Sequence, residues 1–246
     1  MLIVKPIIFN QFADVVCGVS TKVGENTSPP FNFNLSLSVG DDESKVIENR
    51  KSFCNKLGFD FSALAYQKQV HGDDISIVSA SGFCGESDAI ITKEKGIAIA
   101  ISTADCTPIF IFDRRLKIIA GIHSGWRSTQ KKITSKTINT LKNSFDVNTQ
   151  DLYVYIGPSI SQSNYEVGID VAELFDSKYV NKMHNKFYLN VSRCNYDMLV
   201  DAQIPEENIQ YSNLCTFNEK SLLHSYRREG SKSGRAIGII YMRNND

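Results

Sequence analysis

Three residues with the chemistry of metal ligands stand beside turn-forming or small residues at three separate places in the sequence. They are His71, Cys106 and His123. Small and turn-forming neighbours let a side chain project from a strand end while the backbone comes close to a ligand. Two imidazoles and one thiolate suit Zn²⁺, and three protein ligands leave a fourth position for water or substrate. The combination points to a catalytic zinc site, although no local spacing motif supports it.

The signatures of several other reactive centres are absent from the sequence. Neither GxGxxG, Walker A, HExxH, GxSxG nor the HxE…PCxxC pattern of zinc deaminases occurs. Four histidines cannot supply both the mononuclear and the trinuclear centre of a multicopper oxidase. Two alternatives stay open. His₂Cys is also a blue-copper ligand set, so copper could bind in vitro; without a metal, Cys106 could be a nucleophile with His71 or His123 as its base.

Apolar strands predicted on either side of Cys106 and His123 would place these two residues at strand ends. Residues 96–102 alternate large and small apolar residues, which predicts a strand buried on both faces. Residues 109–112 and 117–123 predict two paired strands joined by a tight turn. The apolar period then changes, and a helix is predicted to begin near Trp126 and to continue to Phe145.

The rest of the chain mixes strands and helices. Residues 1–9 predict an edge strand, residues 29–40 a loop entering a strand, and Asp41 and Asp42 the start of a helix that ends at Gly58. Helices are also predicted near 170–180 and 195–203, and strands at 152–156 and 234–241. Because strands and helices do not alternate as strict βαβ units, the sequence favours a single α+β domain over residues 1–246.

Composition restricts the partners and the compartment. Lys plus Arg number 27, as do Asp plus Glu, so nothing predicts nucleic acid or an anionic membrane as a partner. No apolar run approaches the roughly 20 residues that span a bilayer. The six cysteines form no CxxC pair, which indicates reduced thiols and predicts a cytoplasmic protein.

Short motifs spread in order over the chain resemble those of one protein family. They are Asn34-Leu-Ser, Val39-Gly-Asp, Asn49-Arg50, Gln69-Val-His-Gly72, Asp88-Ala with Thr92, Ala104-Asp-Cys-Thr-Pro108, His123-Ser-Gly-Trp-Arg127, Gly157-Pro-Ser-Ile160, Tyr165-Glu-Val-Gly168, Cys215-Thr216 and Ser225-Tyr-Arg-Arg228. The sequence thereby resembles the purine nucleoside phosphorylase family that has long been labelled polyphenol oxidase or laccase domain. One departure is visible, since Ser124 and Ser128 replace the alanine and the glycine of the usual HAGWRG.

The resemblance implies a zinc-dependent enzyme with His71, Cys106 and His123 as metal ligands. It implies phosphorolysis of adenosine, inosine, guanosine and methylthioadenosine, and deamination of adenosine, with purine nucleosides and phosphate as binding partners. It also implies a layered α/β sandwich with mixed sheets, related in fold to cysteine hydrolases. Some relatives are described as peptidoglycan editing factors, so a cysteine hydrolase or amidase acting on a peptidoglycan precursor, with Cys106 as nucleophile, is the alternative function.

Two carboxylates are candidates for catalysis together with Cys106. Asp73 lies two residues beyond His71, and in an extended segment both side chains would share one face. Asp105 directly precedes Cys106. A carboxylate beside a metal-activated water could act as a base or orient a histidine ligand. The alternative for Asp73 is a solvated turn residue.

Four residues are candidates for substrate binding. Asn34 and Arg50 match family motifs, and Arg227 belongs to a basic pair after Tyr226. Arg127 is expected to bind phosphate, because it follows Gly125 at the predicted start of a helix and its planar guanidinium matches two phosphate oxygens. The alternative for Arg127 is a surface ion pair beside a core tryptophan.

Overall fold

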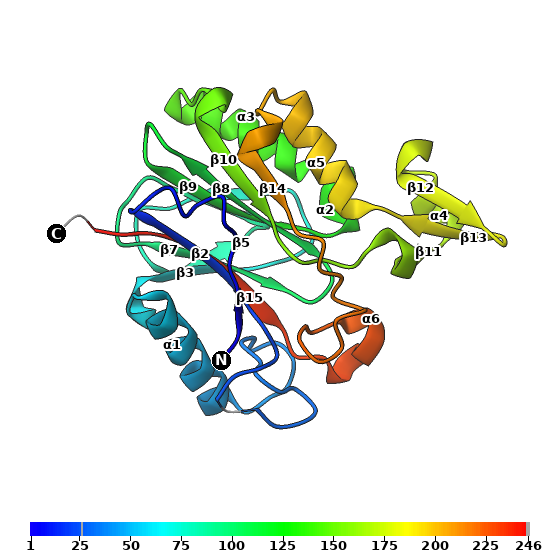
Figure 1. Cartoon of the computed structure of the whole chain (residues 1–246), viewed down its shortest axis with the longest axis horizontal. Coiled ribbons are helices and arrows are strands. Elements are labelled where there is room, and N and C mark those ends of the chain that lie inside the picture. Colours follow the sequence, from blue (N-terminus) through cyan, green and yellow to red (C-terminus); the bar gives the residue numbers. More distant parts are fainter. Residues whose placement is uncertain (26, 245–246) are drawn as a thin grey trace.

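Two six-stranded sheets lie face to face in the computed structural model, which describes residues 1–25 and 27–244 (Figure 1). The first sheet has the order β1 (Ile3–Val4), β2 (Val15–Ser20), β15 (Ala236–Met242), β7 (Ala98–Thr103), β3 (Leu64–Lys68) and β5 (Gly82–Glu86). The second has the order β14 (Ile209–Tyr211), β10 (Leu152–Ile156), β8 (Thr107–Asp113), β9 (Ile118–Ser124), β6 (Ala89–Thr92) and β4 (Ile75–Ile77). Both sheets contain parallel and antiparallel pairs, which confirms the predicted single α+β domain with mixed sheets.

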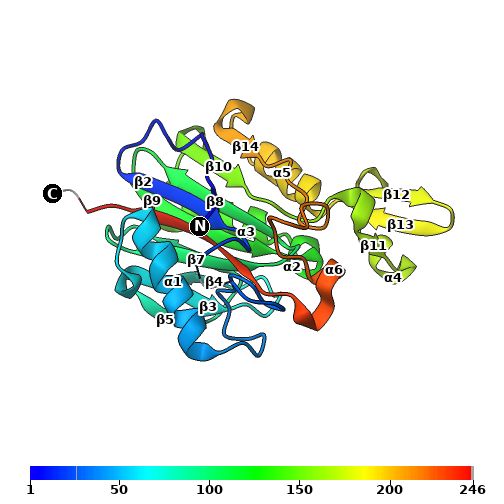
Figure 2. The same cartoon turned by 60° about the horizontal axis from the view of Figure 1, so that its bottom comes forward.

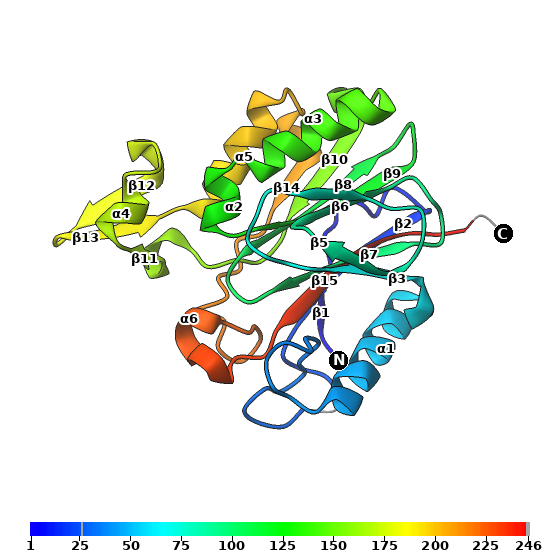
Figure 3. The ribbon, with the colours of Figure 1, turned by 180° about the vertical axis from the view of Figure 1, so that it is seen from behind.

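Helices cover the two outer faces and complete four layers (Figure 3). Helix α1 (Glu43–Leu57) packs on the first sheet, while α3 (Ile133–Phe145) and α5 (Val191–Asp201) pack on the second. The prediction for α1 is confirmed at both ends: the Asp42 carboxylate accepts a hydrogen bond from Lys45 N, and Gly58 takes a left-handed conformation with φ 90°. None of the helices among the described residues is long and apolar enough to cross a membrane.

Side-chain alternation on the central strands separates the layers. On β7, Ile99 and Ile101 fill the space between the sheets, whereas Ala98 and Ala100 face the layer of α1. The predicted burial of this strand on both faces is therefore confirmed. The small residues permit close approach of the helix, and the large ones fill the core between the sheets.

Three predicted elements differ from the structure. Residues 29–40 form no strand; their alternation reflects Phe33 and Leu35, which are buried under α1 by a loop. The helix predicted from Trp126 to Phe145 is broken after α2 (Trp126–Gln130), because Lys132 adopts a left-handed φ of 61°. Near 170–180 the structure has only the short helix α4 (Ile169–Ala172) and a 3₁₀ turn.

Those residues belong to a projecting arm that the sequence did not predict (Figure 2). The arm contains a three-stranded sheet in the order β11 (Glu166–Val167), β13 (Lys186–Leu189) and β12 (Val180–Met183). These strands have only two or four residues each, which is too short for the period-2 apolar pattern on which strand prediction depends.

Burial of His224 leads to a prediction about stability. The ring is 1% exposed, its Nε2 lies 3.2 Å from Phe33 O, and its Nδ1 has no hydrogen-bond partner among the described residues. Burial lowers the pKa of His224 from 6.5 to about 4. The unfolded chain therefore binds a proton here at higher pH than the folded chain does. The contribution of His224 to the free energy of unfolding is therefore complete above pH 6.5. It is lost as the pH falls from about 6.5 to about 4, which lowers the free energy of unfolding by about 3 kcal/mol.

The measurement is urea unfolding of the wild type and of His224→Gln at several pH values between 7 and 4. The variant should lose less stability over this range than the wild type does. His184→Gln serves as the control, because His184 is exposed in the arm. Equal pH dependence in the wild type and His224→Gln would contradict the prediction.

Candidate metal centre

Two connections that cross from one sheet to the other bring the three predicted ligands together. His71 lies where the chain leaves β3 of the first sheet for β4 of the second, and it has a left-handed φ of 58°. Cys106 lies in the turn between β7 and β8, which makes the same crossing. His123 lies near the end of β9, on the face that Ile119 turns toward the first sheet. The site is therefore at the open end of the space between the sheets.

The donor atoms of His71, Cys106 and His123 all lie within 4.8 Å of one another. Cys106 Sγ is 4.0 Å from His71 Nε2, and the two imidazole rings meet edge to face with centroids 4.9 Å apart. Tetrahedral zinc requires ligand atoms roughly 3.3–3.8 Å apart, so small movements would complete the site. Gly125 leaves room beside it, because a Cβ there would lie 3.1 Å from both Cys106 Sγ and His71 Cδ2. The set fits a zinc ion with an open fourth position.

Asp88, which is fully buried, positions two of these ligands. Its Oδ1 accepts hydrogen bonds from His123 Nδ1 at 2.7 Å and from the backbone N–H of His71 at 3.1 Å. Its Oδ2 accepts from the backbone N–H groups of Val70 at 3.2 Å and Gly72 at 2.6 Å. The bond to Nδ1 leaves Nε2 of His123 free to face the other ligands.

Sequence reasoning placed Asp88 in a family motif but assigned it no role. A carboxylate immediately before the fully buried strand β6 was the available signal, since such a group is rarely buried without partners. Burial would raise the pKa of Asp88, but the hydrogen bonds from His123 and the backbone outweigh it and lower the pKa. Asp88 is therefore a carboxylate in the folded protein.

The Cys106 thiol lies in a field that favours its ionised form. Burial would raise its pKa, but the charge and hydrogen bond of His123, followed by those of His71, lower the pKa to about 6. Hydrogen bonds also hold the backbone of the turn that contains Cys106, because Thr103 Oγ1 donates to Cys106 O at 2.5 Å. The side-chain amide of Gln69 accepts from Ser102 N and donates to Ser102 O, both at 2.8 Å, and joins the ends of β3 and β7.

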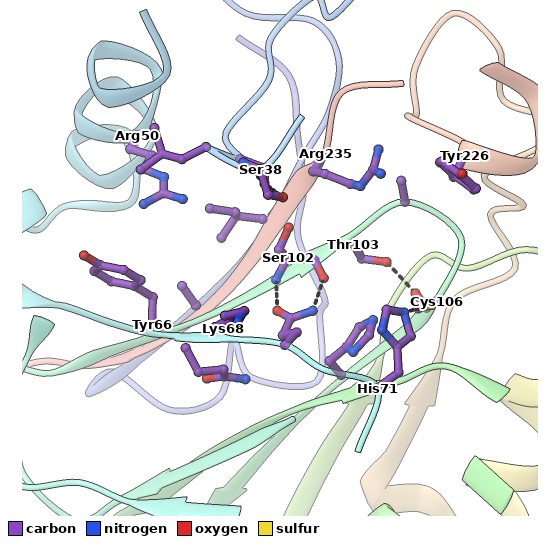
Figure 4. A pocket seen from close by; sticks show the side chains of 18 of the residues that line it. Ser38, Arg50, Tyr66, Lys68, His71, Ser102, Thr103, Cys106, Tyr226 and Arg235 are labelled. Atoms are coloured by element: carbon purple, nitrogen blue, oxygen red, sulfur yellow. Dashed lines mark hydrogen bonds between the residues drawn. The ribbon is translucent and has the colours of Figure 1, made fainter. Parts of the chain in front are cut away.

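A cavity of about 720 Å³ opens from these three ligands. Figure 4 shows His71 and Cys106 at one end, Arg50 and Tyr66 at the other, and Arg235 and Tyr226 above the ligands. Its volume is typical of small-molecule sites. Further residues that line it are Ser36, Ser38, Gln67, Lys68, Phe83 and Thr103.

Two of the predicted substrate contacts differ in their relation to this cavity. Arg50 lines it, donates from Nε to Leu35 O at 2.7 Å, and stacks over Tyr66. Asn34 does not line it. Its buried side chain donates to Ser36 O and Asp41 and accepts from Ser36 N and Arg235 N. This placement favours a structural role for Asn34.

Both predicted carboxylates lie outside the cavity lining. The segment after His71 turns instead of running extended, so Asp73 points to α2 and α3, where it pairs with Lys131 and Lys136. Asp105 is held away from the cavity: its Oδ1 accepts from Thr216 Oγ1 at 2.6 Å and its Oδ2 from Arg227 N at 2.7 Å. These bonds tie the turn of Cys106 to helix α6 (Tyr226–Glu229), which favours a positioning role for Asp105.

The remaining two arginines are exposed and do not line the cavity. Arg127 stacks on Trp126, with its guanidinium carbon 4.2 Å from the ring centroid, and the helix that carries it has only five residues. Arg227 lies over Tyr165 and donates to Glu166 O at the base of the arm. Arg235 lines the cavity instead, at a position that the sequence showed only as part of a closing strand.

Comparison with known proteins identifies the family of the chain. Purine nucleoside phosphorylase YlmD of Bacillus subtilis is 28% identical over 94% of this chain and 89% of its own. Adenosine deaminase RL5, from an unknown prokaryotic organism, is 30% identical over 85% of this chain and 86% of its own. The crystal structure of YlmD from Geobacillus stearothermophilus matches with a TM-score of 0.90 and 28% identity, over 95% of this chain and 93% of that chain. The sequence profile of the family described as multi-copper polyphenol oxidoreductase laccase matches residues 16–243. The predicted relationship is confirmed, and the chain belongs to this laccase-like family.

Proposed function

We propose that this protein is a zinc-dependent purine nucleoside phosphorylase that also deaminates adenosine. The observation that carries the proposal is the cluster of His71, Cys106 and His123 at one end of a cavity large enough for a nucleoside. The names of the relatives, purine nucleoside phosphorylase and adenosine deaminase, agree with it. The substrates would be adenosine, inosine, guanosine or methylthioadenosine, together with phosphate.

The end of the cavity away from the cluster suits a purine base. Tyr66 and Phe83 lie with ring centroids 5.9 Å apart and offer apolar faces. The buried amide of Gln67 also lines the cavity, and neither of its polar atoms has a hydrogen-bond partner among the described residues. A base edge with donors and acceptors would satisfy this amide.

Two reactions would share the cavity. In phosphorolysis, a phosphate oxygen forms a bond to C1′ of the ribose, and the bond from C1′ to the base breaks. In deamination, the oxygen of water forms a bond to C6 of adenine, and ammonia leaves. When bound, zinc would supply Lewis-acid character and make water a nucleophile near neutral pH. The protein's own residues hold the substrate, orient the ligands through Asp88, and restrict access of solvent.

A second candidate is a cysteine hydrolase that acts on a peptidoglycan precursor. One observation favours it: Asp88 orients His123, and His123 in turn lies against the ionisable thiol of Cys106, the order of an acid, base and nucleophile. The cysteine-hydrolase-like fold predicted from the resemblance would agree with this reading. The same residues thus serve either function, and metal content separates the two.

The test is zinc analysis combined with nucleoside assays on the purified protein. The proposal predicts about one zinc per chain, release of free base and ribose 1-phosphate from inosine plus phosphate, and conversion of adenosine to inosine without phosphate. Removal of the metal with a chelator should abolish both activities, and zinc should restore them. Copper could replace zinc in vitro because the ligand set accepts it. Full turnover by metal-free protein, or no turnover of any of these nucleosides by the zinc form, would refute the proposal.

A further inference from the structure

Two arginines face the cavity without an acidic partner. Arg50 and Arg235 both line it, and neither lies within 4 Å of a carboxylate among the described residues. Four other arginines have such partners, namely Arg114, Arg115, Arg193 and Arg228. The remaining three, Arg127, Arg227 and Arg243, also lack one in the described part of the chain but are exposed to solvent, whereas Arg50 and Arg235 are not. A partly buried cation without a counter-charge is costly unless an anion from outside supplies it. The positive charge of the cavity lining therefore favours an anionic ligand.

Of the two, Arg235 lies nearer the candidate metal centre. Ala236, the next residue after Arg235, pairs with Thr103 across β15 and β7, so Arg235 lies beside the turn that holds Cys106. Arg50 instead lies over the Tyr66 ring, at the other end of the cavity. Figure 4 shows the same separation.

Hydrogen bonds from one nitrogen hold the guanidinium of Arg235 in place, and its other two nitrogens make none to the protein among the described residues. Its Nη1 donates to Ser233 O at 2.7 Å and to Gly234 O at 3.1 Å, and its guanidinium carbon lies 5.2 Å from the centroid of the Tyr226 ring. Nε and Nη2 have no protein acceptor among the described residues. These nitrogens form one edge of the planar fork, which matches two oxygens of a phosphate.

We propose that Arg235 binds the inorganic phosphate co-substrate beside the metal centre, an inference that rests on the proposed function. The guanidinium would hold two phosphate oxygens through Nε and Nη2, while a third oxygen attacks C1′. The glycosidic bond breaks, its electron pair leaves with the base, and the base takes up the proton that hydrogen phosphate loses. Arg235 transfers no proton; its fixed charge holds the dianion against the sugar.

This assignment differs from the one predicted from the sequence, in which Arg127 binds phosphate. Arg127 is exposed, stacks on Trp126 and lies outside the cavity lining, and its helix is too short to offer an anion site by itself. Arg235, unlike Arg127, lines the cavity, and the pairing of β15 with β7 places it beside the turn of Cys106.

The experiment compares Arg235→Met and Arg235→Lys in the zinc-loaded protein. The KM for phosphate in inosine phosphorolysis should rise roughly 10- to 100-fold in Arg235→Met, the range for loss of charge-assisted hydrogen bonds. Arg235→Lys should fall between this variant and the wild type, because it keeps the charge and loses the fork. Adenosine deamination without phosphate should fall much less. Arg243→Met is the matched control, since Arg243 is exposed and does not line the cavity.

Calorimetric titration with inorganic phosphate, without a nucleoside, provides a second readout that does not depend on turnover. Phosphate affinity should fall at least 10-fold in Arg235→Met. If no nucleoside is phosphorolysed but this loss of phosphate binding is observed, the proposed function fails and the anion site stands. If the wild type phosphorolyses inosine and Arg235→Met keeps the wild-type KM for phosphate, the inference about Arg235 is overturned. If the KM for phosphate rises in Arg127→Met and not in Arg235→Met, Arg127 is the phosphate-binding residue.

Discussion

Cys106→Ala is expected to remove zinc binding and nucleoside turnover while the protein remains folded. Cys106 provides one of three donors in the cluster, and its ionised thiol balances the charge of a divalent cation. Contacts outside the ligand set typically contribute 10- to 100-fold to metal affinity, so loss of a ligand should cost more than 100-fold. The measurement is zinc affinity by competition with a chromophoric chelator, together with rates of phosphorolysis and deamination.

Cys84→Ala is the matched control for this variant. Cys84 is also partly exposed and lies on β5, outside the cavity lining and the ligand cluster. It should keep the wild-type zinc affinity and both rates. The pattern of losses in Cys106→Ala then separates the two candidate functions. Loss of turnover with zinc affinity unchanged would contradict a role as ligand and favour a nucleophilic cysteine.

Two of the three candidate metal ligands, Cys106 and His123, could be placed from the sequence because recognisable strands flank them, whereas the strand before His71, β3, was not predicted. The size alternation in β7 and the apolar runs in β8 and β9 locate Cys106 and His123 at strand ends. Arg235 could not be predicted in this way. Its position depends on the antiparallel pairing of β15 with β7, which brings the last strand of the chain beside the turn of Cys106. No local pattern specifies that pairing.

The misjudged segments share a physical cause, which is that local patterns do not show where backbone hydrogen bonds go. Phe33 and Leu35 alternate with polar residues as in a strand, but Leu35 N donates to Arg235 O and Phe33 N to Lys22 O within loop contacts. Asp73 shares a short segment with His71, but the left-handed backbone at His71 ends the extended geometry that would have aligned them. The central strands were predictable because a strand buried on both faces leaves a short, almost continuous apolar run between turn signals.

Asp88→Asn tests the inference that one carboxylate positions two metal ligands. Each oxygen of Asp88 accepts two hydrogen bonds, so an amide NH₂ at either position would face two N–H donors. If the amide oxygen stays toward His123, the loop of His71 loses its anchor; if it turns around, His123 loses its partner. We expect zinc affinity to fall 10- to 100-fold and stability to fall by about 2 kcal/mol.

Asp113→Asn provides the matched control, because Asp113 is also a fully buried carboxylate. It lies at the turn of the β8–β9 hairpin, whereas His123 lies near the other end of that hairpin. Its Oδ1 alone accepts the bonds from Arg115 N and Leu116 N, while Oδ2 has no partner among the described residues, so an asparagine can keep both bonds. Zinc affinity should stay at the wild-type value in this control.

In Asp88→Asn, excess zinc should restore much of the lost turnover, because the ligands remain and only their orientation is weakened. Unchanged zinc affinity in Asp88→Asn, with reduced thermal stability, would mean that Asp88 supports the fold without positioning the ligands.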